Sequence, residues 1–347
     1  MAKLKLPKRD VTTLVSKNLF KVKSFTQTIK DAQKIKIPKM LFDELIFETD
    51  LTVIFSSTNI GKTMLAIQIA DSISRGKIIY GFKNEAEPQK VLYCDFELSE
   101  KQFEGRYCEK INGEWFNHYD WHENLKRVTF DLKSEGKITA ENILISIKEC
   151  VKEQKAKVVV IDNIYWINDT GLENSKDAGK LMKYLKLLKN EKDLTIIVLA
   201  HTPKKYKWSP MHKTDLAGSA RIGDFVDAIT AINYSKEDSN YRYLIQLKSR
   251  FTEKKYHSNN VITTKITKVE PNFTGFEFIE PTDENRLEEY HLESKTITEV
   301  YSQETIETNK EKAIEIIKEK PDISSRNLGF EIGVSHQTAN KYLKNHR

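Results

Sequence analysis

The sequence predicts an α/β fold with a mostly parallel central sheet, an antiparallel extension of that sheet, and a small helical unit at the carboxyl end. Three observations support this fold class. Between residues 51 and 202, apolar runs typical of buried strands alternate with helical patterns, as in a parallel sheet covered on both faces. Between residues 225 and 280, strand candidates follow one another with no helix between them. The last ~40 residues carry helix caps and a turn glycine.

Length and composition limit the possible classes of protein. The chain has 347 residues, enough for one large domain and a small one, with 39% hydrophobic and 31% charged residues. No stretch approaches ~20 apolar residues, so we expect no membrane span. The three cysteines are widely spaced, which predicts neither a disulfide framework nor a zinc site and favours a cytoplasmic location. The net charge of +6 permits a polyanionic partner.

Four segments are expected along the chain. Residues 1–35 are rich in lysine and lack a core pattern, so they are interpreted as a basic amino-terminal arm. Residues 36–280 form the main α/β domain, and residues 281–308 form a polar linker. Residues 309–347 form the separate helical unit.

The stretch FSSTNIGKTMLAIQIADSI, residues 55–73, has the form of a phosphate-binding loop that leads into a helix. Gly61, Lys62 and Thr63 fit the pattern G-x-x-x-x-G-K-[ST], but Ser56 stands at the first glycine position. The tripeptide G-K-[ST] alone is weak evidence for a phosphate-binding loop, because about one chain in six of this length contains it by chance. The apolar strand pattern before the loop and the helical pattern after it supply the context that the motif requires.

The chemistry of this loop suits a nucleotide with Mg²⁺. Successive backbone N–H groups and a helix N-terminus form a cradle for anions. Lys62 can reach the β- and γ-phosphates, and the Thr63 hydroxyl can hold Mg²⁺. Ser56 is expected to adopt an unusual backbone angle at a cost of roughly 1–2 kcal/mol. The expected nucleotide-binding residues are Ser56, Ser57, Thr58, Asn59, Ile60, Gly61, Lys62, Thr63 and Met64, together with Asp162.

Three polar residues at the ends of apolar strands complete the expected site. Asp162 ends VVVID, 100 positions after Lys62, and is a candidate Mg²⁺ ligand, although an aspartate there can also cap a turn. Glu97 lies just beyond the strand candidate that follows the loop helix and is placed to orient the attacking water, with Asp95 as its competitor on the same face. His201 ends IIVLAH and is a candidate γ-phosphate sensor rather than a structural histidine.

These segments together resemble the RecA-like P-loop ATPases, and most of all the AAA_25-like RepA type of plasmid replicative helicase, related to the DnaB and KaiC families. The resemblance rests on SSTNIGKT, VLYCDFELS, VVVIDN, VLAHT and DLAGSARIGDFVDAITAI, which span roughly 60% of the chain. It implies a hexameric ring that hydrolyses ATP with Mg²⁺ at subunit interfaces. It also implies Glu97 as the catalytic glutamate, Asp162 as the Mg²⁺ acid and His201 as the sensor. Ser56 departs from the family pattern.

In such rings a neighbouring subunit supplies a cation to the γ-phosphate. The segment LKSR resembles the K-x-R finger of the ring ATPases, so Lys248 and Arg250 are the candidates, with Arg221 as their rival. For each of the three, the alternative is a solvated basic residue.

Two segments are candidates for contact with DNA. The loop after His201 carries Lys204, Lys205 and Lys207 with two aromatic residues, a combination that suits single-stranded DNA in a ring channel, unless the loop is merely solvated. Residues 309–347 have a helix-turn-helix pattern, whose alternative is a protein-binding module. Its last helix would offer base contacts from Gln337, Thr338 and Asn340, and phosphate contacts from Lys341 and Lys344.

The sequence therefore predicts an ATP-driven motor that acts on DNA in the replication of a plasmid or another mobile element. The alternative is an ATP-regulated, sequence-specific DNA-binding regulator or a helicase loader that uses the helix-turn-helix unit.

Overall fold

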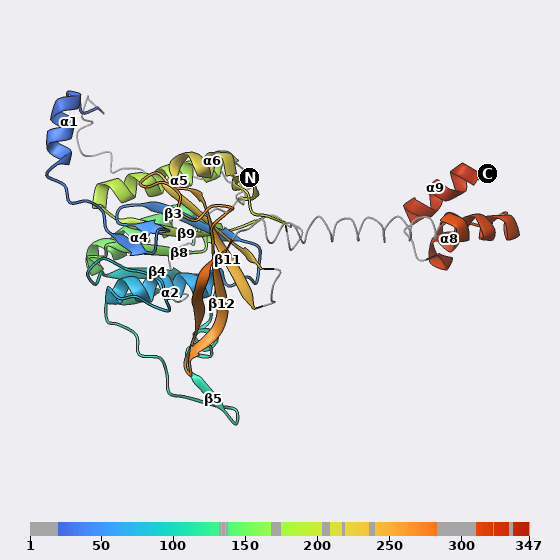
Figure 1. Ribbon diagram of the computed structural model, residues 1–347, viewed down its shortest axis with the longest axis horizontal. Coiled ribbons are helices and arrows are strands. Elements are labelled where there is room, and N and C mark those ends of the chain that lie inside the picture. Colours follow the sequence, from blue (N-terminus) through green and yellow to red (C-terminus); the bar gives the residue numbers. More distant parts are fainter. Residues whose placement is uncertain are drawn as a thin grey trace. The chain divides into compact units, whose positions relative to one another are not determined.

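The computed structural model in Figure 1 describes residues 20–131, 133, 136, 138–167, 175–202, 209–216, 219–235, 240–282, 310–321, 323–332 and 336–346. The chain divides into two compact units, Met1–Glu284 and Asn285–Arg347, and each is described by itself.

The first unit is built on a nine-stranded sheet with the order β13-β12-β11-β10-β3-β9-β8-β4-β7. All neighbours from β10 to β7 pair in parallel, and β11, β12 and β13 add antiparallel strands at the other end. The predicted fold class is confirmed for this unit. The strands are β3 (Leu51–Ser56), β4 (Val91–Asp95), β7 (Leu125–Val128), β8 (Val158–Asp162), β9 (Thr195–His201), β10 (Ala228–Tyr234), β11 (Tyr241–Lys248), β12 (Val261–Glu270) and β13 (Phe273–Thr282).

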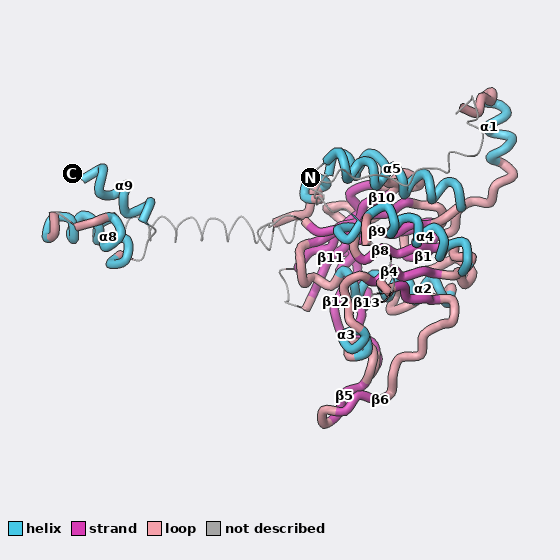
Figure 2. Tube along the Cα trace, turned by 180° about the vertical axis from the view of Figure 1, so that it is seen from behind, coloured by secondary structure: helices cyan, strands magenta, loops and turns pink. Residues whose placement is uncertain are grey.

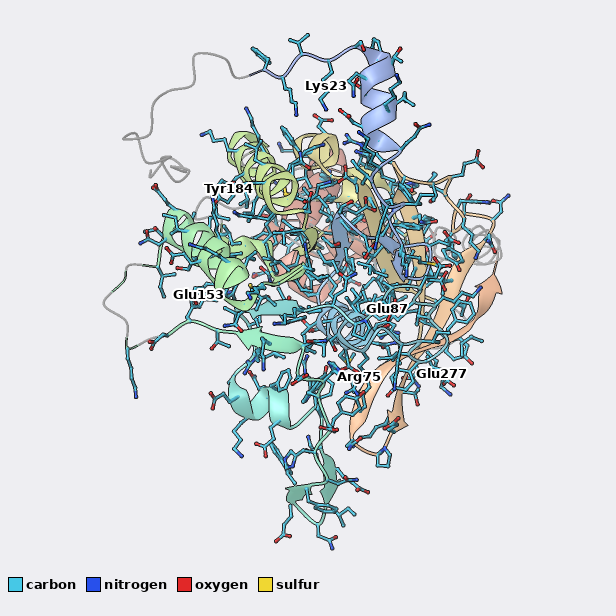
Figure 3. The ribbon with its side chains drawn as sticks, turned by 90° about the vertical axis from the view of Figure 1, so that its left-hand side faces the viewer. Lys23, Arg75, Glu87, Glu153, Tyr184 and Glu277 are labelled. Carbon is cyan, nitrogen blue, oxygen red and sulfur yellow. The ribbon has the colours of Figure 1, made fainter. Side chains whose placement is uncertain are left out.

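Helices cover both faces of this sheet. Figures 1 and 2 show α5 (Ser175–Lys192) and α6 (Ser219–Phe225) on one face and α2 (Lys62–Arg75) on the other. The right-handed crossover from β7 to β8 places α4 (Ala140–Gln154) on the same face as α5. Figure 3 shows Glu153 of α4 and Tyr184 of α5 on these neighbouring helices.

The central strands are apolar throughout because both of their faces are covered. Every residue of β3 and of β8 is buried. The main core joins these strands to α2 and to the small sheet of β1 (Met40–Phe42) and β2 (Ile46–Phe47), which contacts α2. Burying each Leu, Ile or Phe side chain stabilises the fold by about 1.5–3 kcal/mol.

Short local elements were not foreseen. Helix α1 (Phe25–Ala32) lies within the predicted arm, where the Ser24 side chain caps it by accepting from the Gln27 N–H, yet none of its residues is buried. Helix α3 (Glu100–Glu104) follows β4, and β5 (Glu109–Ile111) and β6 (Glu114–Phe116) form an exposed hairpin. Two short 3₁₀ segments, η1 (Ile164–Ile167) and η2 (Lys213–Asp215), follow β8 and β9.

The second unit contains helical residues 310–319, α8 (Ser325–Glu331) and α9 (His336–His346). These segments share a core of Ala313, Ile317, Leu328, Ile332 and Leu343 with other buried residues. Ser324 caps α8 by accepting from the backbone N–H of Asn327, as its position predicts. The helix-turn-helix geometry and the predicted domain boundaries remain predictions.

Across the described part of the chain, no helix combines the length and the apolarity needed to cross a membrane.

Candidate nucleotide-binding and catalytic site

The parallel register brings the predicted nucleotide-binding and catalytic residues to one edge of the sheet. Ser56 at the end of β3 pairs with His201 at the end of β9, and Asp95 at the end of β4 pairs with Asp162 at the end of β8. Because carboxyl ends of parallel strands meet at the same edge, the loop that begins after Ser56 faces the other strand ends. We call this the carboxyl edge.

The loop between β3 and α2 has the backbone of a phosphate cradle. Asn59 and Gly61 adopt positive φ angles of 61° and 113°, and Gly61 precedes the first turn of α2. A Cβ atom at Gly61 would lie 2.8 Å from the Phe276 ring of β13, so both the angle and the space require glycine. Ser56 instead continues β3 and is not among the positive-φ residues. The strain predicted at Ser56 was wrong, because the left-handed turn falls later in the loop.

Lys62 is a buried cation whose hydrogen-bond partners are neutral. Its Nζ donates to the carbonyls of Ser56 (3.2 Å) and Ser57 (2.9 Å) and to the Ser56 hydroxyl (3.0 Å). It also lies 3.0 Å from Nδ1 of His201. Burial lowers the pKa of Lys62 to about 8, against the opposing effect of Asp162 and Glu97. An anion in the loop would relieve the cost of burying this charge.

Asp162 is the matching buried anion. Its Oδ2 accepts from the Tyr93 hydroxyl at 2.8 Å, and Thr63 also donates to it. Burial raises the pKa of Asp162 to about 6, although both hydrogen bonds lower it. Thr63 and Asp162 therefore place a hydroxyl and a carboxylate together. Such hard oxygen ligands, completed by phosphates and waters, fit Mg²⁺.

Glu97 and Asp95 have different roles. Asp95 is buried and accepts from Arg127 Nε at 2.9 Å and from the N–H groups of Glu97 and Leu98 at 3.1 and 3.0 Å. Its carboxylate is therefore occupied in holding the turn after β4. The Glu97 side chain is 37% exposed, and the nearby His201 lowers the pKa of Glu97 although burial opposes this. Of the two acids, Glu97 is the one available to a water molecule.

Asn163 is a residue of this site that the sequence analysis missed. It is buried and donates through Nδ2 to Oε1 of Glu97, and Nδ2 lies 3.3 Å from Nε2 of His201. Its position directly after Asp162 was a signal that could have found it. The same signal does not reveal the contact with Glu97, which lies 66 residues away in the chain.

Lys248 and Arg250 are not brought to the carboxyl edge. Lys248 donates to the carbonyls of Gly223 (2.5 Å) and Val226 (2.7 Å). Arg250 donates to Asp227 at 3.3 Å, and the Asp227 carboxylate also accepts the Leu51 N–H at the start of β3. Five residues of strand, about 16 Å, separate that end of β3 from Ser56. Neither cation can therefore reach Lys62 of its own subunit.

Other predicted residues lie outside the described part of the structure. These are Lys204, Lys205 and Lys207, and the side chains of Arg221, Gln337 and Thr338. On α9, Asn340, Lys341 and Lys344 are exposed.

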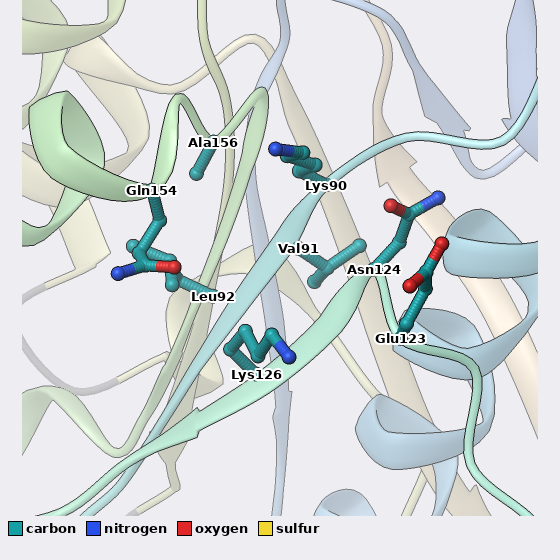
Figure 4. Close-up of a pocket in the computed structure, with 8 residues that line it drawn as sticks. All are labelled: Lys90, Val91, Leu92, Glu123, Asn124, Lys126, Gln154 and Ala156. Atoms are coloured by element: carbon teal, nitrogen blue, oxygen red, sulfur yellow. The ribbon is translucent and has the colours of Figure 1, made fainter.

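A small cavity, shown in Figure 4, is not part of this site. It is lined by Val91 and Leu92 at the beginning of β4 and by Ala156 before β8, with five polar residues around them. These residues lie at the amino ends of the parallel strands, opposite the carboxyl edge.

The chain belongs to the AAA domain family AAA_25, whose match spans residues 16–207, more than half of the sequence. No curated protein matches it. Among solved structures it is similar to a KaiC-like protein, PH0186, from the hyperthermophilic archaeon Pyrococcus horikoshii OT3. The two are 18% identical, the match covers 68% of this chain and 93% of that chain, and the TM-score is 0.46.

Proposed function

We propose that this ATPase is a ring-forming motor that acts on DNA, of the kind represented by the RepA-like replicative helicases of plasmids and mobile elements. The ATP-dependent part of this proposal rests on one observation, the pair of buried charges Lys62 and Asp162 at the carboxyl edge. Lys62 donates to the carbonyls of Ser56 and Ser57 and to the Ser56 hydroxyl, and Asp162 accepts from the Tyr93 hydroxyl. Glu97 lies beside them with an accessible carboxylate.

Each residue of the edge has a part in hydrolysis. The N–H groups of the loop and the Lys62 ammonium bind the phosphates of ATP. Thr63 and Asp162 would hold Mg²⁺, which when bound neutralises charge on the phosphates. Glu97 orients the attacking water and accepts its proton while the water oxygen bonds to the γ-phosphorus and ADP departs. His201, 3.0 Å from Lys62, is placed to change partners when the γ-phosphate leaves.

The positions of Lys248 and Arg250 support action between subunits. Both lie at the amino edge of the parallel strands, so either can serve only the nucleotide of a neighbouring copy. A cation supplied in this way changes phosphoryl-transfer rates by about 10³–10⁵-fold. A closed ring, expected to be a hexamer, supplies that neighbour at every site.

The part of the proposal that concerns DNA rests on two segments. Lys204, Lys205 and Lys207 follow His201 within six residues, so their loop begins at the γ-phosphate side of the site. Lysines neutralise nucleic-acid phosphates, which makes this loop the candidate contact for single-stranded DNA.

A second function, a DNA-binding regulator or helicase loader switched by ATP, is favoured by the carboxyl-terminal unit. That unit has its own apolar core and exposes Asn340, Lys341 and Lys344 on one helix. Such a helix suits duplex DNA.

The test measures ATP hydrolysis by the wild type and by Lys62→Ala, each with and without single-stranded DNA, together with the mass of the wild type in solution. The motor predicts DNA-stimulated turnover from a ring-sized assembly and its loss in Lys62→Ala. Negligible turnover in both conditions, combined with tight sequence-specific duplex binding, would replace the motor by the regulator.

A further inference from the structure

The side-chain amide of Asn163 has a fixed orientation. Its Oδ1 accepts the backbone N–H of Tyr165 at 2.9 Å, in the turn that begins η1. A backbone N–H can only donate, so the oxygen must face it and Nδ2 must face the opposite way. Nδ2 therefore points at Oε1 of Glu97 and lies 3.3 Å from Nε2 of His201.

The proton on His201 can be assigned by the same argument. The Lys62 ammonium lies 3.0 Å from Nδ1 and has no lone pair, so Nδ1 is the acceptor of this pair. The ring proton of His201 is then on Nε2, which lies 3.9 Å from Oε1 of Glu97. The Nε2–H cannot accept from Asn163, so the amide donates to Glu97. Two N–H groups, from Asn163 and His201, thus face one carboxylate oxygen.

We propose that Asn163 is a positioning residue for Glu97: its amide holds Oε1, so that the other carboxylate oxygen is presented to the attacking water. This inference rests on the proposed function, because it assigns the orientation of the residue that handles the water. Asn163 is 4% exposed, and the two hydrogen bonds of its side-chain amide leave that group no freedom to rotate. The partly exposed carboxylate of Glu97, in contrast, would sample several rotamers without this contact.

The two ends of the amide allow the positioning role to be separated from a structural one. Asn163→Asp keeps an oxygen for the Tyr165 N–H and so preserves the turn, but it removes the donor to Glu97. Asn163→Ala removes both contacts. Asn142→Asp, on an exposed position at the start of α4, is the matched control for an added carboxylate.

The experiment is a double-mutant cycle of Asn163→Asp and Glu97→Gln, read as single-turnover ATP hydrolysis, with the affinity for a fluorescent ATP analogue and the thermal unfolding midpoint measured alongside. In the wild-type background, Asn163→Asp is expected to lower turnover about 30–100-fold and to change affinity less than about threefold. In the Glu97→Gln background it should change turnover less than about threefold, because the group it positions is already lost. The unfolding midpoint should match that of Asn142→Asp.

Equal losses of turnover in both backgrounds would overturn the positioning role while leaving ATP hydrolysis intact. So would unchanged turnover in Asn163→Asp. A wild type that does not hydrolyse ATP would instead overturn the proposed function and this inference with it. If Asn163→Asp lowers the unfolding midpoint and Asn163→Ala lowers it equally, the residue is structural.

Discussion

Both edges of the parallel strands contain buried charged side chains, but the partners of these side chains differ: they are charged for Asp227 at the amino edge and neutral for Lys62 at the carboxyl edge. At the amino edge, Asp227 accepts from Lys189 at 3.0 Å, from Arg250 at 3.3 Å and from the Leu51 N–H at 3.0 Å. At the carboxyl edge, the hydrogen-bond partners of Lys62 are carbonyl and hydroxyl oxygens and Nδ1 of His201.

The pKa values reflect this difference. Burial alone would raise the pKa of Asp227, but the Leu51 N–H and Lys189 outweigh it and lower the pKa. For Lys62 and Asp162 burial prevails, and the charged form of each is disfavoured. The amino edge is thus an ion-pair network in which the charged form of Asp227 is favoured. The carboxyl edge retains a cost of buried charge that a bound nucleotide with Mg²⁺ would remove.

The largest expected effect distinguishes Lys62 of the carboxyl edge from Lys189 of the amino edge. Lys62→Ala should lower ATP turnover at least ~100-fold, because it removes a cation aimed at the phosphates. Lys189→Ala should leave turnover within about threefold but lower stability, because it uncovers Asp227. Steady-state hydrolysis and denaturant unfolding of both variants test the contrast. Equal turnover in the two variants would contradict it.

Neutralising Asp227 at the amino edge should have the next largest effect, a loss of stability. Asp227→Asn leaves Lys189 and Arg250 without a counter-charge, so the free energy of unfolding should fall by about 3 kcal/mol. Urea unfolding at neutral pH measures this loss, and the affinity for an ATP analogue serves as the control that should not change. A variant as stable as the wild type would show that this network adds nothing to the fold.

A pH dependence is expected from Asp50, beside the same network. Burial first, and then Asp227, raise the pKa of Asp50 from 3.8 to about 7. The folded carboxyl therefore holds a proton that the unfolded chain has released, and stability falls as the pH rises from about 4 to about 7.

Asp50→Asn removes this loss. The variant should exceed the wild type by about 1–3 kcal/mol in free energy of unfolding at pH 8, and the difference should vanish near pH 4. Unfolding of both proteins across this range measures it. A difference that is constant with pH would show that Asp50 does not titrate with folding.

The smallest effect concerns the residue that departs from the loop pattern. The Ser56 hydroxyl donates to the Ser57 carbonyl at 2.8 Å, so its lone pairs are left to accept from Lys62. Ser56→Ala removes one of the acceptors that compete with phosphate for this ammonium, and the affinity for ATP should rise about threefold. Equilibrium binding of a fluorescent ATP analogue measures the change. Weaker binding would mean that the hydroxyl assists the nucleotide instead.

Sequence patterns of short range predicted most of the sheet and the loop. The apolar runs of β3, β8 and β9 and the helix after Gly61 depend on neighbours in the chain, and the structure has them where they were expected. Lys62 and Thr63 followed from the loop motif for the same reason. The sequence analysis predicted an unusual backbone angle at Ser56, which the structure does not have. The loop pattern does not say which residue makes the left-handed turn.

Local sequence patterns could not predict contacts between residues that are far apart in the chain. The sequence predicted Asp95 and Glu97 on one face of an extended segment, but β4 ends at Asp95. The distant Arg127 on β7 then occupies the Asp95 carboxylate. The Asn163 contact with Glu97 depends on the register of β4 against β8. Helix α1 was missed because it is only eight residues long, although Phe25, Ile29 and Ala32 follow helical spacing.

The most direct measurement of the central claim is single-turnover hydrolysis of ATP with Mg²⁺ by the wild type, Glu97→Gln and the exposed-acid control Glu100→Gln, with nucleotide affinity determined for each. If the carboxyl edge is the ATPase site, Glu97→Gln should bind nucleotide within about threefold of the wild type but hydrolyse it about 100–1,000-fold more slowly. Glu100→Gln should match the wild type in both affinity and hydrolysis rate. Hydrolysis by Glu97→Gln at the wild-type rate would contradict the assignment of this edge as the site of the chemistry.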